Sequence, residues 1–441
     1  NGTTYGATAT YYADISDTWV GYIIKKPDWT KDPDGDRKID ISDVLSGTVH
    51  VYAKTGSALN DFITDKSEAT LGNKITAAVY DSITGVLTVT TAEPVDGDLN
   101  TAFILEGPDG EMPITSVTKV EGQNDYIVEY EGEIDVEQIY KVYFNGMPCE
   151  ITIPNTYSTK EFEAEYTYTG DDLGATWTAD GTTFRLWAPT ASAVSVNLYT
   201  TGDENANDMF NSVEMTQDVN GTWVATIEGD LNGTYYTYSV TRKGETVTAV
   251  DPYARTTGIN GNRAMIVDLD STDPEGWEND TYVTQKNYTD AVIWELHVRD
   301  FSIDPSSGVS DANRGNYLAF TEKGTKVPGT DIATGLDYMV NLGVNYVHLL
   351  PVYDINSVDE VTDGFNWGYD PKNYNVPEGS YSSDPYNGAV RVNEFKQMVQ
   401  SLHTNGIGVI MDVVYNHVAD AGNFCFNKIV PGYFSRIHDD G

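Results

Sequence analysis

Apolar and polar positions alternate along the first 280 residues, and longer apolar runs replace this alternation after about residue 281. The runs VLTVTT (86–91) and DYIVEY (125–130) place an apolar side chain at every second position, as half-buried strands do. Gly, Asp and Pro bound these runs and favour turns. The pattern predicts three β modules, over residues 1–70, 71–157 and 158–280, and the middle one is expected to be an immunoglobulin-like sandwich.

From residue 281 onward, apolar runs are separated by segments of helical periodicity. Strands are predicted at 291–298, 344–353 and 407–414, and helices at 331–343 and 391–406, each with a glycine at its end. Strands that are apolar on both faces indicate a parallel sheet covered by helices. The predicted fold is therefore multidomain, with β-sandwich modules followed by the N-terminal part of a (β/α)8 TIM barrel at 281–441. A complete barrel of this kind needs about 250 residues.

Charge and composition exclude several classes of function. The 441 residues include 26 Lys plus Arg and 67 Asp plus Glu, which gives a net charge of −41. Such a surface repels phosphate backbones and anionic lipid, so we expect no nucleic-acid partner. No apolar run reaches the length of about 18–20 residues that a transmembrane helix needs. Cys149 and Cys425 are expected to be free thiols because they lie in different predicted modules.

Polar side chains gather where the predicted third barrel strand ends. Asp412, Asn416 and His417 stand there, at the end of a strand where barrels place their chemistry. The preceding loop contributes Trp367, Tyr369 and Asp370. Aromatic faces pack against the C–H groups of a sugar ring, and a neutral imidazole can both donate and accept a hydrogen bond at a hydroxyl group. These residue types together indicate a site for carbohydrate.

Three motifs carry a family resemblance: NWGYDP (366–371), NVPEGSYS (375–382) and DVVYNH (412–417). Together they resemble the alpha-amylase superfamily, glycoside hydrolase family 13, and within it the type I pullulanases, which debranch starch. The resemblance implies cleavage of alpha-1,6-glucosidic bonds with retention of configuration. It also implies alpha-glucans as partners, namely pullulan, amylopectin and limit dextrins.

The resemblance assigns roles to the site residues. It implies that Tyr369 stacks beneath the reacting sugar and that Asp370 and His417 form hydrogen bonds there. Trp367 is expected to line the same wall. Site support is implied for two further residues, Asp412 and Asn416. The superfamily takes its nucleophile Asp and its acid/base Glu from later barrel strands, so no catalytic residue is assigned in this chain. The remainder of the barrel would be supplied as continuing sequence or by a second chain.

Two further segments resemble carbohydrate-binding modules. VGYIIKKPDWTKDPDGDRKID (20–40) is similar to the C-terminal half of a family 41 module, and the segment 173–199 resembles a family 48 module. The predicted domains are therefore a partial family 41-like module (1–70), an immunoglobulin-like domain (71–157), a family 48-like module (158–280) and an incomplete barrel (281–441).

The first module contains an acidic loop that could bind calcium. Asp32, Asp34, Asp36 and Asp43 approximate ligand positions of a Ca²⁺ loop, although Arg37 stands where that loop needs glycine. A turn of the binding module and one half of a dockerin are the alternatives for these residues. No other cofactor is expected.

The sequence WELHVRDFS contains a second charged cluster, at Glu295, His297, Arg299 and Asp300. At the first barrel strand we expect these residues to form a structural ion network. Two other functions stay open for the whole chain. It could be a non-catalytic alpha-glucan-binding or scaffold protein, or another enzyme of the superfamily, such as an isoamylase, a branching enzyme or an alpha-amylase. A secreted location, free or attached to the cell surface, is expected.

Overall fold

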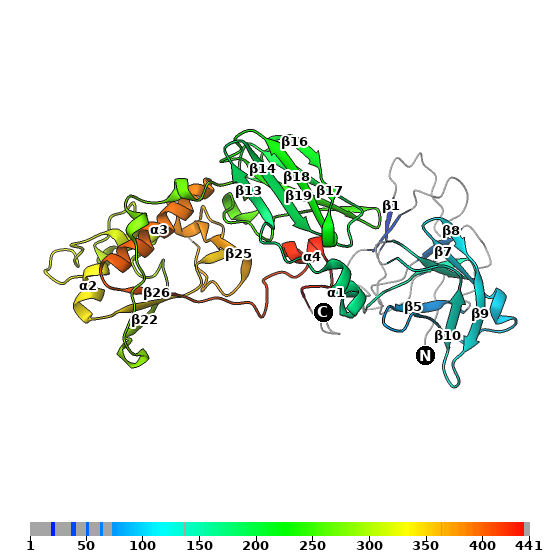
Figure 1. The fold of residues 1–441 in the computed structure, drawn as a ribbon. Helices are drawn as coiled ribbons and strands as arrows, with labels where there is room; N and C mark the ends of the chain where they lie inside the picture. Colours follow the sequence, from blue (N-terminus) through cyan, green and yellow to red (C-terminus); the bar gives the residue numbers. More distant parts are fainter. Residues whose placement is uncertain are drawn as a thin grey trace. The chain divides into compact units, whose positions relative to one another are not determined.

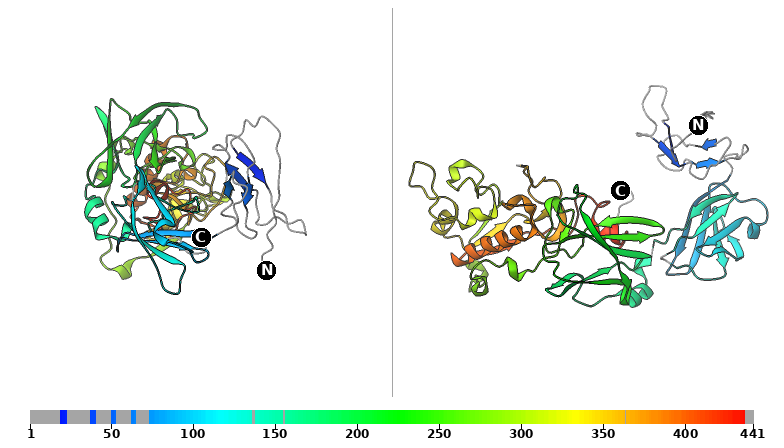
Figure 2. Two further views of the ribbon diagram at one scale, coloured as in Figure 1. Left: turned by 90° about the vertical axis from the view of Figure 1, so that its right-hand side faces the viewer. Right: turned by 90° about the horizontal axis from the view of Figure 1, so that it is seen from above.

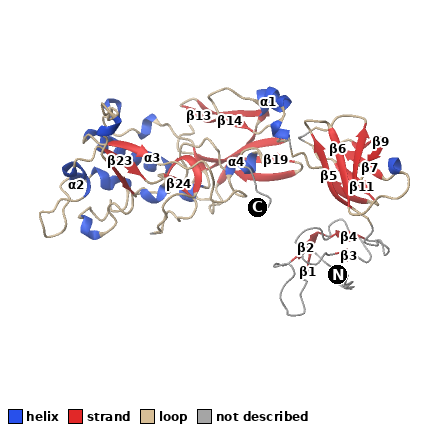
Figure 3. Cartoon of the chain, turned by 90° about the horizontal axis from the view of Figure 1, so that it is seen from below, coloured by secondary structure: helices blue, strands red, loops and turns tan. Residues whose placement is uncertain are grey.

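The computed structural model describes residues 73–135, 138–154, 156–362 and 364–435, together with four strands among the first 72 residues. These strands form two antiparallel pairs, β1 (Trp19–Tyr22) with β2 (Arg37–Asp40) and β3 (His50–Tyr52) with β4 (Phe62–Thr64). The candidate calcium ligands Asp32, Asp34, Asp36 and Asp43 lie outside the described residues. The chain divides into two compact units, Asn1–Glu133 with Tyr140–Ile153, and Ile134–Ile139 with Pro154–Gly441. Figure 3 shows strands in both units, with most of the helices in the second.

The first unit contains the predicted β-sandwich. Its sheets have the orders β5-β6-β10-β9 and β12-β11-β7-β8. Alternate side chains of β6, among them Leu87 and Val89, are buried in the core. Asn145 and Gly146 join β11 to β12 with positive φ angles of 52° and 76°, as a two-residue hairpin turn requires. The strands are β5 (Ile75–Asp81), β6 (Val86–Thr91), β7 (Phe103–Gly107), β8 (Gly110–Met112), β9 (Ile114–Lys119), β10 (Asp125–Tyr130), β11 (Lys141–Phe144) and β12 (Met147–Glu150).

The second unit begins with helix α1 (Lys160–Tyr166) and a second sandwich. Its sheets have the orders β13-β14-β18-β17 and β16-β15-β19-β20, with β21 paired to β19. Trp223, Tyr236 and Tyr238 are buried in the core between the sheets, so they pack the module and do not form an exposed sugar platform. The strands are β13 (Gly174–Thr178), β14 (Gly181–Trp187), β15 (Ala193–Tyr199), β16 (Met209–Glu214), β17 (Thr216–Gln217), β18 (Thr222–Glu228), β19 (Tyr235–Arg242), β20 (Glu245–Ala249) and β21 (Ala264–Met265).

The last part of this unit is the predicted start of a barrel. Strands β22 (Ile293–Leu296), β23 (Tyr346–Leu349) and β26 (Gly408–Met411) form a parallel sheet in that order. Helices α2 (Gly335–Leu342) and α3 (Gly388–Thr404) are the crossovers, and Figures 1 and 2 show α3 beside the sheet. The fold class predicted from the sequence is confirmed. No helix in the described part of the chain is long and apolar enough to cross a bilayer.

The predicted element boundaries need correction. All three barrel strands are shorter than their apolar runs. Helix α2 begins four residues later than predicted. The backbone N–H of Thr334 donates to the Thr325 carbonyl, and that of Val327 donates to the Ile332 carbonyl. These hydrogen bonds hold the preceding segment in a tight turn. Helix α3 begins three residues earlier, where the side chain of Asn387 accepts a hydrogen bond from the backbone N–H of Ala389.

An antiparallel ribbon that the sequence pattern did not predict lies between β23 and α3. It consists of β24 (Tyr353–Ile355) and β25 (Pro371–Pro377), and its register shifts twice within three residues. The loop that joins the two strands carries the NWGYD motif. The ribbon therefore determines where that motif lies relative to the barrel sheet.

The family 48-like module and the barrel portion share a hydrophobic core. Val376 of β25 and Ile429 of α4 (Cys425–Ile429) pack among the buried side chains of the sandwich. Figure 1 shows α4 against the strands of the module. Hydrogen bonds also join the two parts, since the Tyr235 hydroxyl donates to the Tyr386 carbonyl at 2.8 Å. Cys425 is buried, and both cysteines are free thiols, as predicted.

We predict that residues 282–441 expressed alone will aggregate. Both outer strands of the three-stranded sheet already have an unpaired edge among the described residues, and without the module the apolar surface that packs on it would be exposed as well. Residues 154–441, which keep the module, are the control and should remain more soluble. Size-exclusion chromatography and thermal melting measure both, and a monomeric 282–441 fragment with a cooperative melt would contradict the prediction.

Candidate functional site

The carboxyl ends of the three parallel strands bring polar side chains together. Glu295 of β22 is paired in register with His348 of β23, and Asp412 directly follows β26. The Nδ1 atom of His348 lies 3.5 Å from a Glu295 carboxylate oxygen, and its Nε2 atom lies 3.7 Å from Oδ2 of Asp412. The imidazole therefore stands between two carboxylates at the end of the strands where barrels hold their sites.

Tyr369 joins this row from the ribbon loop. Its hydroxyl donates a hydrogen bond of 2.6 Å to Oδ2 of Asp412. This bond to a carboxylate, with burial as a smaller cause, raises the pKa of Tyr369 to about 12, so the hydroxyl keeps its proton throughout the physiological range. Asp412 is thereby held by a residue 43 positions away in sequence.

His417 lies beside the same tyrosine. Its Nε2 atom is 2.6 Å from the Tyr369 carbonyl oxygen, which can accept only if Nε2 carries the proton. The side chains of His417 and the adjacent Asn416 are exposed. The Nδ1 atom of His417 is then the ring nitrogen with a free lone pair for a ligand hydroxyl.

The NWGYD loop exposes an aromatic surface next to these groups. Trp367 is 62% exposed and Phe365 is 50% exposed. Gly368 has a φ of 92°, and a Cβ at this position would lie 2.9 Å from the Pro351 carbonyl oxygen. The loop can therefore follow this path only with glycine here.

Asp370 anchors the loop to the ribbon. Its Oδ2 atom accepts a hydrogen bond from the Ser357 backbone N–H at 2.8 Å, and its carbonyl oxygen accepts one from Asn356 at 3.0 Å. The Oδ1 atom is buried and has no hydrogen-bond partner. The structure thus gives Asp370 a local structural contact in addition to its predicted role toward a sugar.

His297, expected to belong to an ion network, is a buried support of the loop. Its Nδ1 atom accepts the Asp300 backbone N–H, so Nε2 carries the proton and donates to the Asn366 carbonyl at 2.9 Å. The Tyr381 hydroxyl also lies 2.9 Å from Nε2. Burial lowers the pKa of His297, which favours the neutral ring. The expected ion network is confirmed in part: Nη1 of Arg299 lies 3.6 Å from Oδ1 of Asp300, whereas Glu295 pairs with His348 outside the motif.

Sequence reasoning missed His348. It lies within the apolar run VNYVHLLPVY, where a polar residue is easily taken as a core exception. Its alignment with Glu295 and Asp412 follows only from parallel pairing of strands that are about 50–60 residues apart in sequence. The available signal was a single polar residue on one face of an otherwise apolar strand.

The chemistry of this arrangement is recognition of hydroxyl-rich rings. Exposed aromatic faces lie next to imidazole and carboxylate groups that can exchange hydrogen bonds with hydroxyls. Retaining hydrolysis needs two carboxylates about 5–5.5 Å apart that face one substrate bond. Glu295 and Asp412 instead have an imidazole between them, so we assign no nucleophile or general acid among the described residues.

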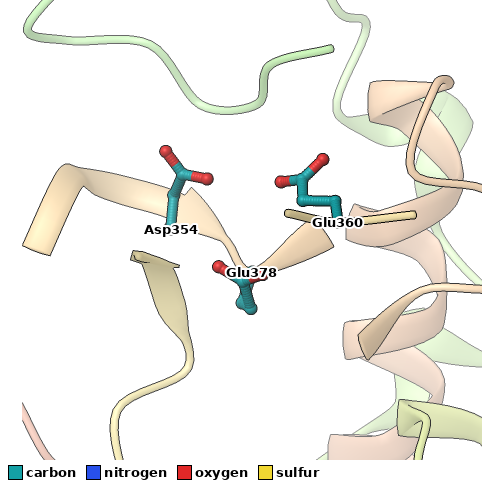
Figure 4. A group of neighbouring side chains, drawn as sticks. All are labelled: Asp354, Glu360 and Glu378. Carbon is teal, nitrogen blue, oxygen red and sulfur yellow. The ribbon is translucent and has the colours of Figure 1, made fainter. Parts of the chain in front are cut away.

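A separate acidic cluster lies beneath the ribbon (Figure 4). Its members, Asp354, Glu360 and Glu378, each have a carboxylate oxygen within 4.8 Å of the others, and all three are buried. This spacing alone would allow a metal ion. However, Ca²⁺ takes six to eight oxygen ligands, and only Oδ1 of Asp354 lacks a hydrogen-bond donor among the carboxylate oxygens. Arg391 already supplies positive charge at 2.9 Å from Glu360, so the cluster does not fit a divalent ion.

Two family models match the chain. The model of carbohydrate-binding module 48 (isoamylase N-terminal domain) matches residues 172–254. The model of the alpha amylase catalytic domain matches residues 327–431. The first match covers the second sandwich, and the second covers the ribbon, the NWGYD loop and the end of β26.

Known pullulanases are similar to this chain. The pullulanase of Bacillus subtilis (strain 168) is 39% identical over 298 residues, which cover 67% of this chain and 40% of the relative. The chloroplastic pullulanase 1 of Arabidopsis thaliana is 38% identical over 323 residues, 63% of this chain and 32% of the relative. The chain thus spans less than half the length of these relatives.

Solved pullulanase structures have the same fold over much of the chain. The Paenibacillus barengoltzii pullulanase in complex with maltohexaose and alpha-cyclodextrin has 49% identity and a TM-score of 0.61, covering 67% of this chain and 44% of that one. The Anoxybacillus sp. LM18-11 pullulanase in complex with maltotetraose has 33% identity and a TM-score of 0.69, covering 83% and 51%. The chain is therefore similar to the N-terminal portion of the type I pullulanases of the alpha-amylase superfamily.

Proposed function

We propose that the protein to which this chain belongs is a starch-debranching glycoside hydrolase. It would cleave alpha-1,6-glucosidic bonds of pullulan, amylopectin and limit dextrins with retention of configuration. The observation that carries this proposal is the convergence of Tyr369, His417 and Asp412 at the carboxyl ends of the barrel strands. The maltooligosaccharides bound in the related pullulanase structures support alpha-glucan as the ligand.

In this proposal the chain provides the glucan-binding half of the site. Tyr369 offers its ring to a glucose unit while its hydroxyl holds Asp412, and Nδ1 of His417 accepts from a glucose hydroxyl. Trp367 extends the aromatic wall. The nucleophile Asp and the acid/base Glu would come from the remainder of the barrel. Secretion to the cell exterior, and Ca²⁺ at Asp32, Asp34, Asp36 and Asp43, are further parts of the proposal.

The direct test is hydrolysis of pullulan by the protein that includes the remainder of the barrel. We expect release of maltotriose, measured by chromatography of the products, and no release from a beta-linked glucan. An intact protein that binds pullulan without cleaving it would instead favour the glucan-binding or scaffold function, because no carboxylate pair for hydrolysis is assigned among the described residues.

We predict that His417→Ala lowers kcat/KM for pullulan by about 10- to 100-fold, because a hydrogen bond to a reacting sugar contributes about 1–3 kcal/mol. His417 is exposed, so the variant should melt within a degree or two of the parent. The exposed Lys326→Ala, far from the strand ends in sequence, is the control. Unchanged kcat/KM in the His417 variant would remove this residue from the site.

Two substitutions at Tyr369 separate its ring from its hydroxyl. Tyr369→Phe keeps the aromatic face but removes the donor to Asp412, and we expect it to lower the free energy of unfolding by about 1–2 kcal/mol while maltotriose affinity falls only slightly. Tyr369→Ala removes the ring as well, and a further loss of about 3- to 10-fold in affinity is expected. Calorimetric titration with maltotriose compares the two, and equal affinities would show that the ring does not stack on sugar.

A further inference from the structure

The acidic cluster beneath the ribbon holds more negative charge than its cations balance. Asp354 is 1% exposed, Glu378 is fully buried and Glu360 is 6% exposed. The cationic side chains that face them are Arg391 of α3, which is fully buried, and Lys372 of β25. Three carboxylates thus face two cations. An unbalanced buried charge is costly, so such a group takes up a proton instead.

The hydrogen bonds show which carboxylates are ionised. The Glu360 carboxylate accepts hydrogen bonds from both terminal nitrogens of Arg391, at 3.0 and 2.9 Å. It also accepts one from the backbone N–H of Asn260 at 2.7 Å. The two oxygens of Glu378 each accept a backbone N–H, from Ser380 at 2.9 Å and from Ile355 at 2.8 Å. Bonds from N–H donors favour the charged form of a carboxyl group. Glu360 and Glu378 are therefore the ionised pair.

Asp354 is the remaining member and differs from both. Its Oδ2 atom accepts one hydrogen bond, from the Asn373 side chain at 2.6 Å, whereas its Oδ1 atom is buried without a partner. Lys372 donates to the carbonyl and side-chain oxygens of the module residues Asn260 and Asn262, and not to Asp354. A proton on Asp354 would remove the negative charge of a buried carboxyl group that has a single hydrogen-bond donor, in a cluster whose carboxylate oxygens lie within 4.8 Å of one another.

The cluster is connected to the site through the ribbon. Asp354 lies in β24, and the next residue, Ile355, is paired in register with Pro371, which directly follows Asp370 of the NWGYD motif. The cluster also holds the module, because Arg391 donates to the Gly258 carbonyl and Glu360 accepts from Asn260. A change in its charge would act on the module loop and on the loop that carries Tyr369.

We propose that Asp354 is a positioning residue that carries a proton at neutral pH, and that this neutral carboxyl group keeps the ribbon and the module loop in the arrangement that binds alpha-glucan. The ligand in this inference rests on the proposed function, whereas the proton on Asp354 does not. Loss of the proton leaves the cluster with an unbalanced negative charge. The ribbon then loosens, and Tyr369 is no longer held in place.

Burial, and next the negative charge of Glu360, raise the pKa of Asp354 to about 7, which is the direction that this arrangement requires. Burial and the charge of Asp354 also raise the pKa of Glu378, to about 8, so the two carboxyl groups compete for one proton. We assign the proton to Asp354 because both oxygens of Glu378 accept backbone N–H hydrogen bonds, which favour its charged form. The titratable or charged side chains that face the pair are Glu360, Lys372, Arg391, Tyr317 and Tyr381.

The sign of the pH dependence follows from the raised pKa. A carboxyl group whose pKa is higher in the folded than in the unfolded state stabilises the fold below its unfolded pKa, and this stability is lost as pH rises through the folded pKa. The melting temperature of the chain should therefore fall between about pH 4 and about pH 8 and level off above the folded pKa. Maltotriose affinity follows the proton of the folded state, so it should fall only above the folded pKa, by up to tenfold per pH unit.

The experiment compares Asp354→Asn with Glu360→Gln in the 441-residue chain, using melting temperature between about pH 4 and pH 9 and calorimetric titration with maltotriose between about pH 6 and pH 9. Asn mimics a protonated Asp, so D354N should match the parent at pH 6 within about twofold in affinity and should lose the alkaline decline. E360Q removes the partner of Arg391 and should melt lower at every pH. Asp311→Asn, at a side chain that is 90% exposed, is the matched control and should keep the parent profile.

Each outcome decides the proposal. A D354N variant that melts as low as E360Q at pH 6, or that keeps the alkaline decline, would overturn it. If E360Q does not fold, infrared difference spectra of the parent still decide, because a protonated buried carboxyl gives a C=O band that D354N must lack. If the chain shows the predicted melting profile but binds no maltotriose, the proton on Asp354 stands and the glucan-binding role that the proposed function gives to this chain fails.

Discussion

The parallel register of β22, β23 and β26 is the constraint on which the candidate site depends. Because the strands run in the same direction, Glu295, His348 and Asp412 meet at one end of the sheet although the chain separates them widely. The row gains its fourth member when the Tyr369 hydroxyl bonds to Asp412. A shift of one residue in this register would turn these side chains to the other face and separate them.

The ribbon of β24 and β25 connects this row to the rest of the unit. It presents the NWGYD loop on one side, and on the other it covers a buried group of charges that also holds the module. Arg391 is central there, since its guanidinium contacts Glu360 and the carbonyl oxygens of Gly258 and Pro385. Removing one member of a buried charge pair leaves the other uncompensated, so these contacts fix a single arrangement of the segments.

The family 48-like module is therefore part of the architecture of the barrel portion. Val376 and Ile429 complete its hydrophobic core, and Asn260 contributes to the acidic cluster. The module positions the ribbon, and the ribbon positions the aromatic loop. The family 48-like module and the barrel portion, which follow one another in the sequence, are thus also in direct contact within the second unit.

Local pattern in the sequence determined most of the fold. Period-2 alternation predicted the sandwiches, the apolar runs and Gly-terminated helices predicted the parallel sheet, and the motifs around Tyr369 and His417 indicated the site. The roles of the individual site residues stay predictions. The sequence could not place His348 beside its partners, or indicate the ribbon or the acidic cluster, because each depends on contacts between distant residues, such as Glu360 with Arg391. Such contacts depend on strand pairing and burial, which only the tertiary structure specifies. Periodicity and turn chemistry, in contrast, act between near neighbours in the sequence and can be read from it.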